Sequence, residues 1–251
     1  MSLQSKQIEP PENAVSATDI RSQEFENFIY LVSHDVRNSV RALLEVPQWI
    51  EEDLENAGVQ IKGPLADNIE LMNTHTRRLD RMLIDLLVYS RIGRMQNNGE
   101  VAWGDVIDLI TDQINVPPGF RIIRDLQEPI IVMGENDVMT LVSSLISNAI
   151  KHHDNREGCV WIQTVSNSEY VSLTVVDDGP GIPIKSREKV FEVMTTLRPR
   201  DEVEGSGMGL AKVRKIVTFY GGDIEWLDTE GGRGTALRFR FPKQRPTRIT
   251  H

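Results

Sequence analysis

The sequence predicts an α+β protein: a helical hairpin followed by an α/β sandwich with helices on one face of a largely antiparallel sheet. Three observations predict this class. Apolar residues recur at steps of three and four over two early stretches of about thirty residues each. Beyond residue 100, shorter helix-like and strand-like segments are mixed. The chain has 251 residues, of which 39% are hydrophobic, so it can bury a substantial core.

The first part of the chain is predicted to be two long helices, over residues 21–57 and about 64–93. Pro47 interrupts the first apolar run, so we expect a kink or weak point there. A lone hairpin would leave one face of each helix apolar and wet, which favours dimerisation into a four-helix bundle. Packing of the hairpin onto the rest of its own chain is the alternative. The second helix carries a heptad seam at Leu65, Ile69, Met72, Thr76, Leu79, Leu83 and Leu86.

The later part of the chain is predicted to hold alternating helices and strands. A strong apolar helix is expected over 137–152, with further helices over 104–114 and 207–220. Strands are expected over 120–125, 130–133, 160–165, 170–176, 223–228 and 234–241. We therefore divide the chain into a disordered lead or cloning remnant (1–20), the hairpin (21–93), a polar linker (94–100), an α/β domain (101–244) and a tail (245–251).

Composition narrows the classes of function. The net charge is −9, which argues against nucleic acid as a main partner because phosphate backbones favour clustered Lys and Arg. The single cysteine, Cys159, excludes an intramolecular disulfide framework and fits a reducing compartment. No stretch approaches the ~18 apolar residues of a membrane span, and no signal peptide opens the chain. We expect a soluble, cytoplasmic protein without membrane contact.

The stretch around His34 suggests phosphate chemistry. A neutral imidazole nitrogen is a good nucleophile near pH 7. Asp35 is adjacent and can orient the ring or accept its proton, whereas Asn38 lies one turn on and shares the face of His34. An amide at that position could hold a water for removal of phosphate. A structural histidine on the apolar seam is the alternative, but the flanking Asp and Asn favour a functional one.

Residues farther along suggest a nucleotide site. The amide of Asn148 suits Mg²⁺, and Lys151 is one turn away and can reach phosphates. Asp177 ends a predicted strand, where it can accept a hydrogen bond from an exocyclic amine such as that of adenine, and the glycines after it let backbone approach a ligand. Read alone, Asp177–Pro183 could be a surface turn and Asn148 a capping residue.

A glycine cluster, Gly205–Gly209, opens a predicted helix, and backbone donors there can bind an anion. A dinucleotide fold is disfavoured because no parallel βαβ unit surrounds the cluster. Between the glycine-rich segments, residues 195–202 are polar and of mixed charge, which is typical of a mobile lid. The order of motifs, a phosphate acceptor first and an ATP site afterwards, suggests that the protein phosphorylates itself.

Together the motifs resemble those of two-component sensor histidine kinases, over nearly the whole chain. The resemblance implies a dimeric helical hairpin followed by a Bergerat-type α/β sandwich of the gyrase, Hsp90, histidine kinase and MutL superfamily. The matching segments are Ser33–Asn38 (phosphoacceptor box), Ser144–Lys151 (asparagine box), Asp177–Gly181 and Gly205–Gly209 (glycine boxes), Phe191 between them, and Gly234-Thr235.

The resemblance also implies an activity in signal transduction: ATP- and Mg²⁺-dependent autophosphorylation of His34, then transfer to an aspartate on the receiver domain of a response regulator. It implies a homodimer, and an upstream sensor domain that this chain lacks. The catalytic residues would be His34, Asp35 and Asn38, with Asn148 the metal ligand. The nucleotide would contact Asn148, Lys151, His152, Asp177, Gly179, Gly181, Gly205, Gly207, Met208, Gly209, Leu210 and Thr235.

Three departures from the family pattern keep alternatives open. Ser39 replaces a common proline, so the usual kink could move to Pro47; Ser144 replaces a usual first asparagine. His152 and His153 replace an aromatic-polar pair, and we expect one to line the nucleotide pocket and the other to lie on the surface. Ser144 leaves open a phosphotransfer or scaffold protein with a degenerate ATP domain. A superfamily ATPase acting as a clamp is disfavoured, because it needs a Glu at position 144 and leaves His34 unexplained.

Overall fold

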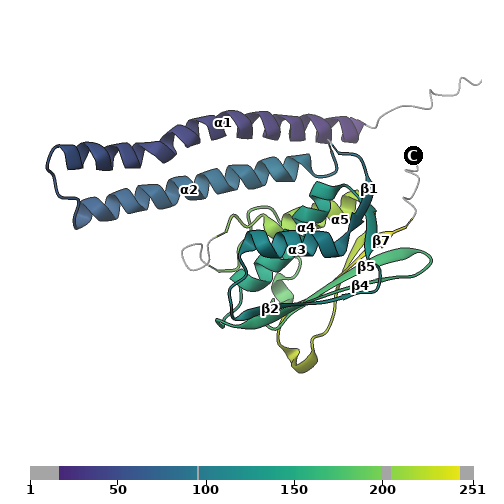
Figure 1. Ribbon diagram of the computed structural model, residues 1–251. Helices are drawn as coiled ribbons and strands as arrows, with labels where there is room; N and C mark the ends of the chain where they lie inside the picture. Colours follow the sequence, from purple (N-terminus) through teal and green to yellow (C-terminus); the bar gives the residue numbers. More distant parts are fainter. Residues whose placement is uncertain (1–16, 95, 199–204, 244–251) are drawn as a thin grey trace, which may run out of the picture.

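The computed structural model describes residues 17–94, 96–198 and 205–243, with the backbone alone described for 17–28 and 230. Two long helices, α1 (Ala17–Asn56) and α2 (Pro64–Arg91), run antiparallel along one side of the molecule (Figure 1). The helix α1 continues through Pro47 without a break in its assignment. The predicted helical hairpin is confirmed, with its helix ends shifted by a few residues.

The hairpin buries one face of each helix and exposes much of another. Val40, Ile69 and Leu83 are buried between the helices. Leu31 and Trp49 remain 60% and 53% exposed, and further exposed apolar residues along the hairpin include Val32, Val36, Leu43, Ile50, Leu71 and Leu79. Apolar surface of this extent costs free energy in water. Dimerisation of the hairpin stays a prediction, and this face is where it would occur.

A five-stranded sheet forms the base of the second part, in the order β2-β4-β5-β7-β6. Only β2 and β4 are parallel, and the other neighbours are antiparallel, so the predicted largely antiparallel sheet is confirmed. A separate antiparallel pair joins β1 to β3. The strands are β1 (Gly99–Ala102), β2 (Phe120–Leu126), β3 (Ile130–Met133), β4 (Gly158–Ser166), β5 (Tyr170–Asp177), β6 (Asp223–Trp226) and β7 (Ala236–Pro242).

The strand β1 was missed by the sequence patterns. It begins at Gly99, inside the segment expected to be a polar linker over 94–100. Its first two residues are Gly99 and Glu100, so it lacks the apolar run that marked the equally short β3. Its pairing with β3 ties the end of the hairpin to the α/β domain. The connection between the two parts is therefore shorter than predicted.

Three helices cover one face of the sheet: α3 (Trp103–Ile114), α4 (Glu135–Lys151) and α5 (Gly209–Phe219). In Figure 1 they lie between the sheet and the hairpin. Their apolar sides pack on the sheet around fully buried Trp103, Ile146 and Phe239. Each such large side chain contributes about 1.5–3 kcal/mol of burial free energy, so the loops at the strand and helix ends project from a rigid base. The short 3₁₀ helices are η1 (Ile184–Ser186), η2 (Lys189–Phe191) and η3 (Glu230–Gly232).

Some sequence predictions fall outside the described residues. These are the lead up to residue 16, the second half of the predicted lid (199–202), and the tail from 244 onward. Cys159 is a free, buried thiol. Within the described ranges, no helix has the length and apolar character needed to cross a membrane.

Candidate functional site

The predicted phosphate acceptor lies on the exposed side of α1. The His34 side chain is 57% exposed, and its Nδ1 lies 3.2 Å from Asp35 Oδ1. When Nδ1 carries the proton, it donates to this carboxylate and leaves the Nε2 lone pair free. Asn38 is exposed one turn later on the same face. The Tyr30 ring stacks on the imidazole with centroids 6.4 Å apart.

Contacts across the hairpin fix the level of His34 along the bundle. Arg37 Nε donates to Asp80 Oδ1 at 3.2 Å, and Arg91 donates to the Tyr30 hydroxyl at 3.2 Å. Because α1 and α2 are antiparallel, a residue between Tyr30 and Arg37 faces α2 between Asp80 and Arg91. His34 is therefore level with the middle of that α2 segment.

A pocket of about 400 Å³ opens in the α/β domain beside α2. Most of the predicted nucleotide contacts line it, although they come from four separate stretches of sequence. Gly179 and Met208 are the exceptions, and Met208 is fully buried in the core. The predicted residues that line the pocket are Asn148, Lys151, His152, Asp177, Gly181, Gly205, Gly207, Gly209, Leu210 and Thr235.

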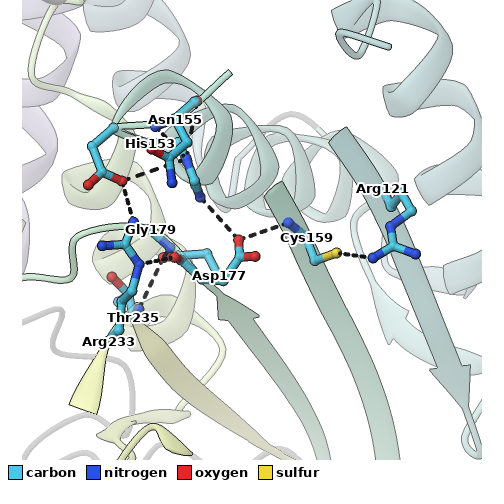
Figure 2. Close-up of polar contacts among 10 residues, drawn as sticks. Arg121, His153, Asn155, Cys159, Asp177, Gly179, Arg233 and Thr235 are labelled. Carbon is cyan, nitrogen blue, oxygen red and sulfur yellow. Dashed lines mark hydrogen bonds and ion pairs between the residues drawn. The ribbon is translucent and has the colours of Figure 1, made fainter. Parts of the chain in front are cut away.

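Asp177 marks one end of this pocket, at the end of β5. Its Oδ1 accepts hydrogen bonds from the backbone N–H groups of Gly179 at 3.0 Å and Thr235 at 3.1 Å (Figure 2). Burial raises the pKa of this carboxyl above its ordinary value, although these hydrogen bonds oppose the shift. The second oxygen can accept from an amine in the pocket. Gly234 has φ +90°, and a Cβ there would overlap the Asp177 carbonyl.

Asn148 and the start of α5 form the other end of the pocket. A Cβ at Gly209 would lie 3.1 Å from the Asn148 amide, so the amide rests against the first turn of α5. Free backbone N–H groups at this helix N-terminus favour an anion. Gly207 has φ +74°, which a residue with a side chain rarely adopts. The Asn148 amide, a group of the kind that can ligate Mg²⁺, therefore lies beside a helix N-terminus whose N–H groups favour an anion.

Ser144 carries the most unusual polar atom of the pocket wall. The residue is 6% exposed, and its hydroxyl has no hydrogen-bond partner in the described protein. A buried hydroxyl without a partner costs about 1–3 kcal/mol. The hydroxyl is therefore available to a ligand or a water in the pocket.

The structure adds pocket residues from the hairpin that the motifs did not suggest. Arg81 and Asp85 of α2 line the pocket. Asp85 Oδ1 accepts from Lys212 Nζ at 2.7 Å, and its Oδ2 accepts from the Ser206 hydroxyl. Lys215 Nζ donates to the Tyr89 carbonyl at 2.8 Å. Such contacts, more than 120 residues apart in sequence, leave no local pattern. We call the set formed by Asp85, Ser206 and Lys212 the α2 clasp.

A second link between hairpin and domain is formed by Asp137, which is buried in the first turn of α4. Its Oδ2 accepts from the Tyr220 hydroxyl at 2.8 Å and from the Gly93 N–H at 3.0 Å. Burial raises the pKa of Asp137, although these hydrogen bonds oppose the shift. The end of the hairpin is thereby tied to both α4 and α5.

The two adjacent histidines differ from the expectation in one respect. His152 lines the pocket, as predicted for one of them. The prediction of a surface position for the other is wrong, because the His153 side chain is only 2% exposed and contacts Asp178. Among the described residues, no group of three or more His, Cys, Asp or Glu side chains is arranged to hold a metal.

The sequence of this chain is similar to a family model and to proteins that carry histidine kinase names. Residues 133–245 match the family model described as histidine kinase-, DNA gyrase B-, and HSP90-like ATPase. The methanogenesis regulatory histidine kinase FilI of Methanothrix harundinacea is 30% identical over 91% of this chain and 26% of its own length. The sensor histidine kinase WalK of Bacillus subtilis is 26% identical over 91% of this chain and 38% of its own length. The chain thus spans well under half of either relative.

Solved structures agree on the arrangement of elements. Full-length ShkA in complex with AMPPNP aligns with a TM-score of 0.65 at 20% identity, covering 86% of this chain and 46% of ShkA. The mycobacterial sensor histidine kinase MprB aligns with a TM-score of 0.50 at 25% identity, over 58% of this chain and 97% of that structure. The match to ShkA extends over most of both the hairpin and the α/β domain.

Proposed function

We propose that this histidine kinase core, whose ATP-binding domain belongs to the histidine kinase-, DNA gyrase B-, and HSP90-like ATPase family, phosphorylates its own His34. The strongest support is that His34 and the start of α5 lie at the same height along the hairpin. His34 is exposed on α1, and the α2 clasp holds the start of α5 against the α2 segment that faces it. The acceptor and the phosphate end of the pocket thus lie along the same stretch of the hairpin.

The acceptor chemistry follows from the contact between His34 and Asp35. With Nδ1–H donating to the carboxylate, the Nε2 lone pair attacks the γ-phosphorus of ATP, and the bond from that phosphorus to the ADP oxygen breaks. The ring gains positive charge as the new bond forms. Asp35 stabilises that charge and can take the Nδ1 proton.

The pocket would hold ATP with its adenine at Asp177 and its phosphates at the first turn of α5. Asn148 would hold Mg²⁺ and Lys151 would contact phosphate, a proposal supported by the position of both residues in the pocket lining. Mg²⁺, when bound, neutralises charge on the β- and γ-phosphate oxygens. Ser206 and Lys212 keep the glycine-rich segment against α2.

In the cell we propose that phospho-His34 passes its phosphoryl group to an aspartate on the receiver domain of a response regulator. Two hairpins would associate as a homodimer through their exposed apolar faces. Asn38 would hold a water during removal of phosphate from that regulator. An Asn38→Ala variant with intact His34 should then lose dephosphorylation while keeping autophosphorylation. Dephosphorylation of the regulator at the full rate by this variant would show that Asn38 does not hold that water.

The proposal is tested by intact-protein mass spectrometry after incubation with ATP and Mg²⁺ near neutral pH. Three proteins are compared: wild type, His34→Gln, and His75→Gln. His75 is a matched control because it is also a helical, exposed histidine of the hairpin, on α2. One added phosphoryl group on wild type and His75→Gln, and none on His34→Gln, is expected.

Other results would favour other functions. If wild type and both variants bind ATP and release phosphate but none of them keeps a phosphoryl group, the protein acts as an ATPase. If wild type binds no nucleotide, it is a phosphotransfer or scaffold protein. Ser144→Asn, which restores the usual asparagine of the family, would then be the first variant to examine for regained binding.

A further inference from the structure

His153 lies just beyond α4 and behind the nucleotide pocket without lining it. Its side chain is only 2% exposed, and its ring packs edge-on against Phe120 with centroids 5.2 Å apart. A histidine buried this deeply needs hydrogen bonds to both ring nitrogens. The structure provides both, and they decide which nitrogen carries the proton.

The Asn155 backbone N–H donates to His153 Nδ1 at 3.0 Å. The Asn155 carbonyl lies 3.2 Å from the same nitrogen, so the contacts of Nδ1 suit either role. The proton on Nε2 follows from its other neighbour, because the Asp178 carboxylate can only accept. The Nε2–H then donates to Asp178 Oδ1 at 3.1 Å. The imidazole thus bridges the loop after α4 to the residue that follows β5 (Figure 2).

Asp178 Oδ1 accepts a second hydrogen bond, from the Cys159 N–H at 2.8 Å. Burial alone would raise the pKa of Asp178, but the hydrogen bonds from Cys159 and His153 hold it below its ordinary value, so the carboxylate is ionised at neutral pH. One carboxylate oxygen therefore joins the loop after α4, the start of β4 and the end of β5. In Figure 2 these contacts form a continuous chain beside Asp177.

Two glycines make room for this arrangement. A Cβ at Gly158 would lie 2.7 Å from His153 Nε2 and 3.0 Å from Asp178 Oδ1. A Cβ at Gly179 would lie 3.4 Å from His153 Cδ2. Only a residue without a side chain at position 158 lets the ring reach the carboxylate undisturbed.

We propose that His153 is a positioning residue for nucleotide binding: by holding Asp178 it fixes the Asp177–Gly179 segment, and so the carboxylate that receives the adenine amine. This inference rests on the proposed ATP-binding function. Asp178 lies between Asp177 and Gly179, whose N–H donates to Asp177 Oδ1 at 3.0 Å. Rotation of the peptide units around Asp178 would break that bond and turn the Asp177 carboxylate.

Asp178 has another restraint, which limits the expected effect. Arg233 Nε donates to the Asp178 carbonyl at 2.9 Å, and the same guanidinium donates to Asp154 at 2.5 Å. The backbone stays tethered from the β7 side when His153 is changed. Loss of the imidazole should therefore loosen the adenine end of the pocket without destroying it.

Two substitutions of His153 by side chains of equal length distinguish the effect of the Nε2 hydrogen bond from the effect of side-chain packing. His153→Gln keeps an N–H donor near the position of Nε2, and His153→Met keeps bulk without the donor. We expect His153→Met to weaken AMPPNP–Mg²⁺ binding about fivefold to tenfold, less than the full effect of one lost hydrogen bond to a charged group, because Arg233 still holds the Asp178 backbone. His153→Gln should stay within about twofold of wild type. In autophosphorylation the Met variant should raise the KM for ATP and leave kcat nearly unchanged.

Calorimetry of AMPPNP–Mg²⁺ binding gives distinguishable failures. If both variants bind as wild type does, or if both weaken equally, the positioning role of the Nε2 donor is refuted while ATP binding stands. If wild type binds no nucleotide, the proposed function fails and the inference fails with it. If His153→Met does not fold, ¹⁵N NMR of wild-type histidines decides: a neutral Nε2–H tautomer for His153 supports the proposal, and an Nδ1–H tautomer overturns it.

Discussion

The polar side chains of the pocket wall differ in whether other groups of the protein form hydrogen bonds with them. Asp177 already accepts two backbone hydrogen bonds, whereas the Ser144 hydroxyl has no partner among the described residues. A carboxylate held in this way keeps its orientation before a ligand arrives, which lowers the entropic cost of binding. An unsatisfied hydroxyl has the opposite character, because it gains a partner only when something enters the pocket.

Ser144→Ala removes that unsatisfied hydroxyl with little change in volume. We expect the free energy of unfolding to stay unchanged or rise by up to about 1 kcal/mol, because the desolvation penalty of the hydroxyl is lost. Nucleotide affinity should fall severalfold if the hydroxyl serves the ligand. Urea denaturation and AMPPNP binding measure the two effects separately. A clear loss of stability would show that the hydroxyl has a partner in the protein.

The raised pKa of Asp177 predicts how binding depends on pH. In the folded protein this carboxyl takes its proton above its ordinary value of 3.8. The ionised form is needed to accept the adenine amine, so nucleotide affinity should begin to fall at pH values above that of an ordinary aspartate. Asp177→Asn should bind weakly and lose this acid limb. An affinity that stays constant down to the ordinary pKa would contradict the assignment.

Protonation of Asp177 has the opposite effect on stability: it weakens nucleotide binding but raises the free energy of unfolding. A folded pKa above the unfolded one means that the folded state binds its proton first as the pH falls. The contribution of Asp177 to the free energy of unfolding therefore rises as the pH drops from the folded pKa toward 3.8. Comparison of urea denaturation of wild type and Asp177→Asn across that range measures this contribution. A wild type that becomes less stable relative to Asp177→Asn as the pH falls through that range would contradict it.

Among the elements, the segment just before β7 has little conformational freedom. Gly234 has φ +90°, and a Cβ there would overlap the Asp177 carbonyl. Gly234→Ala should lower the free energy of unfolding by about 2–4 kcal/mol, through backbone strain and displacement of the Asp177–Thr235 contact. Gly99→Ala at the start of β1 is the control, since nothing lies within 4 Å of its Cβ position. Equal stability of the two variants in urea would show that the β7 segment adjusts freely.

The sequence predicted most of these elements, and the reasons for the exceptions are physical. The long amphipathic helices and the alternating strands were found because their apolar periods extend over many residues. The strand β1 was missed because it begins with Gly99 and Glu100 in a polar stretch, whereas the equally short β3 is apolar throughout. Pocket-lining residues such as Asn148 and Asp177 were predicted because they lie in short motifs at element ends. The roles of Asp85 and His153 could not be predicted, because they depend on contacts between distant elements.

For the whole molecule, the α2 clasp determines how the α/β domain sits on the hairpin. Asp85 and Lys212 are mostly buried where they meet, so removal of one partner leaves a buried charge unpaired and costs more than breaking a surface pair. Asp85→Ala should free the domain from α2 and increase hydrogen exchange at the start of α5. A double-mutant cycle with Lys212→Ala should give a coupling energy of about 1–3 kcal/mol.

A surface ion pair of the same domain gives the matched control for the clasp. Arg124 Nη1 and Asp108 Oδ1 lie 2.5 Å apart on exposed side chains, so Arg124→Ala should cost less than about 1 kcal/mol and leave α5 exchange unchanged. If Asp85→Ala and Arg124→Ala behave alike, the clasp does not hold the two parts together.

The exposed apolar face of the hairpin predicts self-association. Leu31→Glu and Leu43→Glu each place a charge on this face, so both should shift a dimer toward monomer in sedimentation equilibrium. Neither side chain is buried within the chain, and the helical content should therefore be preserved. A wild-type chain that sediments as a monomer at all accessible concentrations would contradict the proposed four-helix bundle.

Transfer of label from γ-labelled ATP with Mg²⁺ to wild type, His34→Gln and Asn148→Ala decides whether His34 is the phosphoryl acceptor. We expect label on wild type alone, stable to alkali and lost in acid, because a phosphoryl group on a histidine nitrogen has that stability. Label that survives acid, or label of equal amount on His34→Gln, would contradict this expectation.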